Sequence, residues 1–145
     1  MKPKLLLRIA AVLMFLHTMG HTLGALTWKT APNPVIGLVI KGMETNHFDF
    51  MGRSVTLASF YEGYGFMMIF VYMYMSILLW LLSTDPGNKL CVRLLPILAI
   101  LLLSLGIIEY IYFFPFAAAI SVVAGLCTLA SLFAKGSSSR PVLNS

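Results

Sequence analysis

The chain has 145 residues, of which 59% are hydrophobic and 10% charged, whereas about a quarter of the residues in a soluble domain are charged. This composition excludes a soluble fold, and the length accommodates about four helical crossings of about 20 residues each. The net charge of +5 comes from basic residues scattered near the expected helix ends. Membrane topology and lipid headgroups explain such charges, so nucleic acid is not an expected partner.

The first apolar segment, residues 5–26, follows two lysines and predicts a membrane-crossing helix. A cleaved signal peptide is the alternative, but polar residues interrupt the apolar run and no clean cleavage site follows it. Residues 27–54 are more polar, and their prolines end any helical continuation. Within this connection, Asn33 and Pro34 predict the start of a short helix whose apolar stripe suits the membrane interface.

Three further apolar segments predict crossings at residues 55–82, 92–112 and 115–133. Residues 135–145 are rich in serine and are expected to form a disordered cytoplasmic tail. The sequence therefore predicts an all-α fold, with residues 1–134 as a single membrane domain. That domain is a bundle of four transmembrane helices with a short interfacial helix in its first loop.

The distribution of basic residues predicts the orientation in the membrane. Seven fall on the side of the two termini: Lys2, Lys4, Arg8, Lys89, Arg93, Lys135 and Arg140. The other side has Lys29, Lys41 and Arg53. Because short cytoplasmic segments carry the excess of lysine and arginine, both termini are expected in the cytoplasm.

Ionisable side chains inside the hydrocarbon region are costly, so each one is a candidate functional residue. His17, His21, Glu62 and Glu109 all lie within expected crossings. At about 1.5 Å per helical residue, they fall in the same leaflet, and His47 lies in the loop at that membrane face. The sequence thus predicts one polar site in the outer leaflet.

His17 and His21 are four residues apart and therefore share one helix face. Two imidazoles at this spacing match half of a zinc site, with Glu62, Glu109 or His47 as further ligands. A haem ligated by one of the histidines is another interpretation. A purely structural role, in which both histidines hydrogen-bond to neighbouring helices, is the alternative to all of these.

The favoured interpretation is a pocket for a small lipophilic or amphipathic molecule, such as a lipid, isoprenoid or quinone. Its polar head is expected against His17, His21 and Glu62, while Tyr61 and Tyr64 offer ring faces and hydroxyl groups. A structural or accessory subunit of a membrane complex, and an intramembrane metal-binding protein, are the alternative functions. The sequence leaves open whether the protein is an enzyme and which cofactor it uses.

Gly20 and Gly24 form a G-x-x-x-G pair on the first helix. Small residues at this spacing let another helix approach closely, so they are the expected contact in a homo- or hetero-oligomer.

Several segments carry a family resemblance: Leu7-Arg-Ile-Ala-Ala with His17 and His21-Thr-Leu-Gly, Asn46-His-Phe-Asp-Phe-Met-Gly, and Phe60-Tyr-Glu-Gly-Tyr-Gly. With these segments the chain resembles a family of small bacterial four-helix membrane proteins over most of its length. Its first helix also resembles that of DoxX-type membrane proteins. The resemblance implies a bacterial inner membrane protein in which His21, His47 and the Tyr-Glu-Gly-Tyr-Gly segment belong to a recurring pattern.

Overall fold

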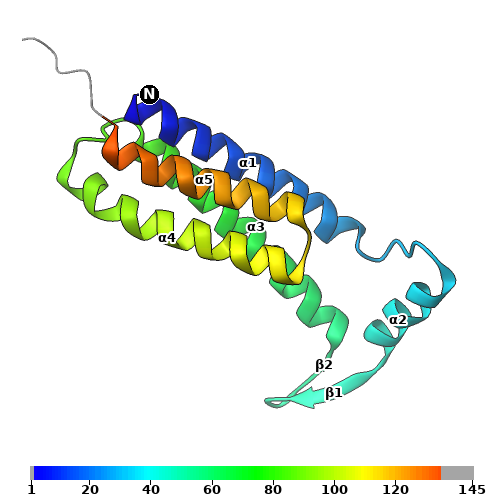
Figure 1. Ribbon diagram of the computed structural model, residues 1–145. Coiled ribbons are helices and arrows are strands. Elements are labelled where there is room, and N and C mark those ends of the chain that lie inside the picture. The colour runs from blue at the N-terminus through cyan, green and yellow to red at the C-terminus, as the bar shows by residue number, and fades with distance from the viewer. Residues whose placement is uncertain (1, 135–145) are drawn as a thin grey trace, which may run out of the picture. The chain divides into compact units, whose positions relative to one another are not determined.

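The computed structural model of the protein describes residues 2–134, and these residues confirm the all-α fold class. Four helices are long and apolar enough to cross a membrane: α1 (Pro3–Thr27), α3 (Leu57–Leu82), α4 (Lys89–Tyr112) and α5 (Pro115–Phe133) (Figure 1). The short helix α2 (Pro34–Thr45) lies in the first loop. The protein is a multi-pass membrane protein, and the tail predicted for residues 135–145 lies outside the described residues.

The described chain divides into two compact units. Of the described residues, the first unit takes in 2–17 and 74–134, and the second takes in Thr18–Met73. Both α1 and α3 contribute one part to each unit.

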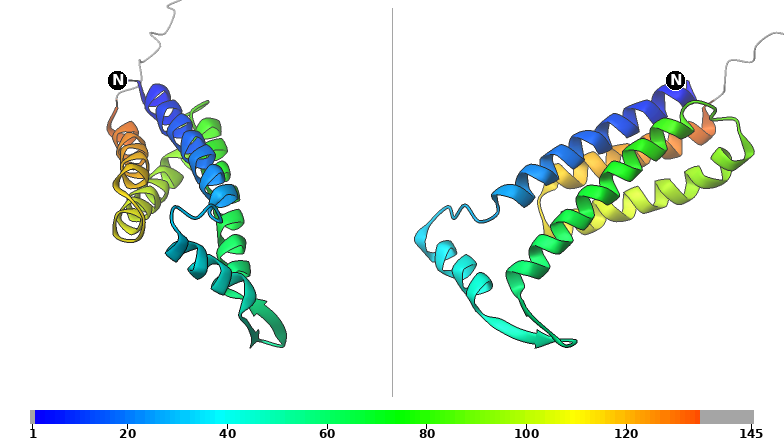
Figure 2. Two further views of the ribbon diagram at one scale, coloured as in Figure 1. Left: turned by 90° about the vertical axis from the view of Figure 1, so that its right-hand side faces the viewer. Right: turned by 180° about the vertical axis from the view of Figure 1, so that it is seen from behind.

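The first unit contains the bundle, built from the first part of α1, the last part of α3, and all of α4 and α5 (Figures 1 and 2). Its core is apolar and includes Leu7, Met14, Leu79, Leu95 and Leu102, each at most 1% exposed. The Ser76 hydroxyl donates a 2.8 Å hydrogen bond to the carbonyl oxygen of Ala11, which joins α3 to α1. Large apolar side chains on the outer faces of the helices are exposed, as expected where lipid surrounds a bundle.

The bundle is drawn close together by small side chains on the inner face of α5. The buried residues of that helix are Ala117, Ala118, Ser121, Ala124, Gly125, Thr128 and Ser131. A Cβ atom added to Gly106 of α4 would lie 2.5 Å from Cγ2 of Val122, and one added to Gly125 would lie 2.9 Å from Cγ of Leu103. Because lipid gives helices no hydrophobic drive to associate, this close contact and its dispersion attraction hold α4 against α5.

Local capping bonds decide where the helices begin. Asn33 caps α2 by accepting a 3.0 Å hydrogen bond from the amide of Ile36, as its position before Pro34 predicts. Thr56 and Ser59 exchange 3.1 Å hydrogen bonds between side chain and amide, which is a capping box at the start of α3. This box explains why α3 begins at Leu57 rather than at residue 55.

The second unit holds a β-hairpin that the sequence analysis does not predict. Strands β1 (His47–Phe50) and β2 (Arg53–Thr56) pair antiparallel. The tip residues Met51 and Gly52 both have positive φ, 51° and 81°, as the two-residue turns that fit hairpin twist require. Strands of only four residues are too short a signal to identify from the sequence, and Met-Gly lacks the turn preference of Asn-Gly.

Candidate functional site

The most buried polar cluster of the first unit joins three helices. His17 of α1 places Nε2 3.4 Å from Oε1 of Glu109 on α4. The hydroxyl oxygen of Ser121 on α5 lies 3.3 Å from Nδ1 of the same imidazole. The exposed fractions are 6% for His17, 3% for Glu109 and zero for Ser121. We call these three residues the polar centre.

In the polar centre the His17 imidazole lies between the Ser121 hydroxyl and the Glu109 carboxylate, and these neighbours determine which ring nitrogen can donate a hydrogen bond. Nε2 of His17 faces Oε1 of Glu109, and a carboxylate oxygen accepts from an imidazole N–H. In a neutral imidazole Nδ1 then accepts from the Ser121 hydroxyl, whereas in an imidazolium both nitrogens donate. The arrangement resembles that of nucleophilic triads, but Ser121 has no exposed surface. In this conformation the polar centre joins three helices rather than presenting a nucleophile.

His21 has a different environment, in the second unit. Its Nε2 lies 3.1 Å from the carbonyl oxygen of Gly65 on α3, to which it donates. The ring of Tyr72 meets the imidazole edge-on, with centroids 5.3 Å apart. These contacts hold the last turns of α1 against the first half of α3.

Glu62 also belongs to the second unit, where it forms an ion pair. The ammonium nitrogen of Lys29 lies 2.8 Å from Oε1 of Glu62 and 2.9 Å from Oε1 of Glu44. Hydrogen bonds to Glu62 first, and then to Glu44, raise the pKa of Lys29 to about 12. Lys29 thereby fastens α2 to the start of α3, and this is the contact that Glu62 makes.

The remaining predicted residues of the second unit are exposed. Tyr61 packs against Trp28 at 4.8 Å between ring centroids, and Tyr64 stacks with Phe60 at 6.5 Å. His47 lies on β1, and its Nδ1 is 3.1 Å from the carbonyl oxygen of Thr45.

The structure therefore brings together two of the predicted site residues, His17 and Glu109, and adds Ser121, which the sequence analysis does not select. The other predicted residues lie in the second unit, so the single shared site stays a prediction. Within residues 2–134, no three histidine, cysteine, aspartate or glutamate side chains gather as metal ligands. Metal binding by His17 and His21 stays a prediction.

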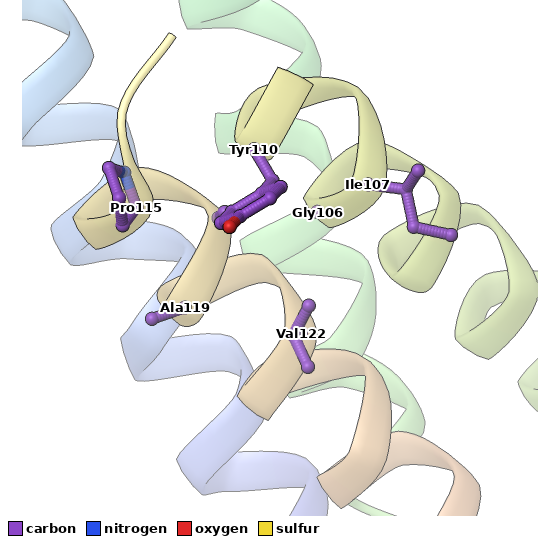
Figure 3. Close-up of a pocket in the computed structure, with 7 residues that line it drawn as sticks. Gly106, Ile107, Tyr110, Pro115, Ala119 and Val122 are labelled. Atoms are coloured by element: carbon purple, nitrogen blue, oxygen red, sulfur yellow. The ribbon is translucent and has the colours of Figure 1, made fainter. Parts of the chain in front are cut away.

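An apolar groove lies on the seam between α4 and α5, at the same helical turns as Glu109 and Ser121. It has a volume of about 380 Å³, within the range of small-molecule sites. Its lining residues are Gly106, Ile107, Tyr110, Pro115, Ala118, Ala119 and Val122. Figure 3 shows Tyr110 reaching from α4 toward Pro115 and Ala119 on α5. None of the residues predicted to bind a ligand lines this groove.

Gly20 and Gly24 face open space within the part of the chain that the structure describes. A Cβ atom added at either position would meet nothing within 4 Å. Assembly through this pair stays a prediction.

Comparison with models of protein families, with curated proteins and with solved structures finds no match to this chain.

Proposed function

We propose that the protein resides in a bacterial inner membrane with both termini in the cytoplasm. The bias of lysine and arginine toward the side of the termini supports this orientation. The even number of candidate spans among the described residues supports a common side for the two termini.

We propose further that the protein binds a small lipophilic or amphipathic molecule, such as a lipid, isoprenoid or quinone, in the α4–α5 groove. The observation that carries this proposal is an apolar groove on the seam between two helices that are long and apolar enough to cross a membrane. Gly106 and Val122, where α4 and α5 approach closely, are among its lining residues. The Tyr110 hydroxyl is the polar group on the lining that could orient a headgroup.

A photoactivatable polyprenol and a phosphatidylglycerol with a photoactivatable acyl chain test this proposal in nanodiscs. Peptide mass spectrometry should find saturable labelling at Ile107 and Tyr110 with one of the two probes, competed by its unlabelled form. Ala119→Leu fills the groove and should reduce the labelling severalfold. Ala130→Leu is the matched control, since Ala130 is an exposed alanine of α5 outside the groove. Equal, non-saturable labelling around both positions would refute a binding site.

A second candidate is a structural or accessory subunit of a membrane complex, and one observation favours it. Three of the predicted site residues already have partners inside the protein: His17 with Glu109, His21 with the Gly65 carbonyl, and Glu62 with Lys29. Under this alternative the polar groups lock helices together, and Gly20 and Gly24 contact a partner helix. Cysteine cross-linking from position 20 in native membranes tests it, because a second protein should then be captured there and not from Ala130→Cys.

A further inference from the structure

A second polar feature of the first unit lies away from the polar centre, near the ends of α1 and α3. The guanidinium carbon of Arg8 lies 4.9 Å from the centroid of the Trp80 ring. The Nε atom of Arg8 is buried, yet it has no hydrogen-bond partner among residues 2–134. The ion pairs of the same residues do not include Arg8 either.

The position of this pair along the helices matches the headgroup region. Arg8 is five residues after the start of α1, which at about 1.5 Å per residue is about 7–8 Å from the helix end. Trp80 is two residues before the end of α3. Arginine side chains near helix ends extend toward the headgroups, and tryptophan is enriched at the same level.

Several basic residues lie at the same end of the bundle as Arg8, and together they would attract an anion. Lys4, four residues earlier, shares the helix face of Arg8 and is exposed. Lys89 and Arg93 start α4 at the same end of the bundle, where Asp85 is the one acidic residue among residues 2–17 and 74–105. A planar fork of guanidinium donors pairs best with a carboxylate or phosphate. Among the described residues Arg8 forms no ion pair with a carboxylate, so an external anion has room to supply the acceptor.

We propose that Arg8, held against Trp80 and assisted by Lys4, binds the phosphate group of an anionic membrane phospholipid. The ring of Trp80 fixes the guanidinium in place and leaves its terminal N–H groups, rather than the buried Nε, for the phosphate oxygens. The lipid is preferred over free phosphate because the site lies beside the hydrocarbon region, where the acyl chains add affinity. This site is independent of the α4–α5 groove.

Native mass spectrometry of the full chain released from nanodiscs tests the proposal. In mixed phosphatidylglycerol and phosphatidylcholine, wild type should retain phosphatidylglycerol selectively. Arg8→Gln should lower that retention about tenfold, the effect of losing a charged hydrogen-bonded pair. Lys2→Gln is the matched control, because it removes the same charge from an exposed residue of the same end and should change retention less than about twofold. Equal losses in both variants would mean diffuse attraction only and would overturn the site.

Two further measurements keep the test decisive if Arg8→Gln fails to fold. Arg8→Lys preserves the charge but not the fork, so it should retain the fold and lose most of the selectivity. The chain has two tryptophans, so Trp28→Phe leaves Trp80 as the sole fluorescent indole. Phosphatidylglycerol should then shift the Trp80 emission, whereas millimolar inorganic phosphate should not. A shift with inorganic phosphate alone would identify a free-anion site, and no shift with either would contradict the proposal.

Discussion

Removing both members of the His17–Glu109 pair should destabilise the protein by less than the sum of the two single removals. His17→Ala leaves the Glu109 carboxylate 3% exposed without the imidazole that lies 3.4 Å away. Breaking a buried pair in this way costs about 3–5 kcal/mol. Each single substitution should cost about that much, while the double substitution should cost less than the sum by about 1–3 kcal/mol. Ser121→Ala removes one neutral partner and should cost only about 1 kcal/mol.

The assay is equilibrium unfolding in mixed micelles with an increasing mole fraction of sodium dodecyl sulfate, followed by circular dichroism. Glu109→Gln serves as the shape control, since it keeps the side-chain volume and removes the charge. Should the two single effects simply add, the pair contributes no coupling and the polar centre does not act as a lock. Loss of ligand labelling at Tyr110 without loss of stability would instead assign the centre to binding.

Three other outcomes follow from the fold. Gly106→Ala should destabilise the bundle by about 1–3 kcal/mol, because an added Cβ overpacks against the neighbouring helix. Gly63→Ala is the control: its added Cβ meets nothing within 4 Å, so the substitution should be neutral or stabilising by up to about 1 kcal/mol. Thermal unfolding in detergent compares the two variants. The raised pKa of Lys29, about 12 against 10.5, means that its contribution to stability is complete below pH 10.5 and is lost as the pH rises through about 12. The difference in melting temperature between wild type and Lys29→Gln should therefore vanish in that window and not at lower pH. A reporter active only in the periplasm and fused after Ser145 should give no signal, and an active fusion would contradict the proposed orientation.

The four spans could be read from the sequence because hydrocarbon thickness imposes apolar runs that few other folds need. The proximity of His17 and Glu109 could also be predicted from the sequence, for a related reason. Both are costly in lipid, and counting residues along the helices places them in the same leaflet.

Ser121 was harder to identify as a site residue because burying a hydroxyl costs little free energy compared with a charge, and because serines are common in membrane helices. The signal that marks it is the spacing of small residues on α5, where Ala117, Ser121, Ala124 and Thr128 follow one helix face. This pattern predicts which face packs inward, and Ser121 lies in the middle of that face.

The pairing of Glu62 could not be derived from sequence spacing. Depth along α3 suggests a buried carboxylate, but the outcome depends on whether a loop cation reaches it. Lys29 does so because α2 also presents Glu44, and the two carboxylates together fix one ammonium group. Such a contact depends on how a connection of six residues, 28–33, is routed between α1 and α2.

The tight turn between α4 and α5 has a consequence for how the protein reaches its membrane. Only Phe113 and Phe114 separate α4 from α5. When α4 crosses the bilayer, it therefore brings the first residue of α5 to the far surface. The pair is therefore expected to insert as one hairpin, with its small-residue contact formed before α1 and α3 pack against it. A glycosylation tag placed in this turn should be modified only in chains long enough to have released α5 from the ribosome.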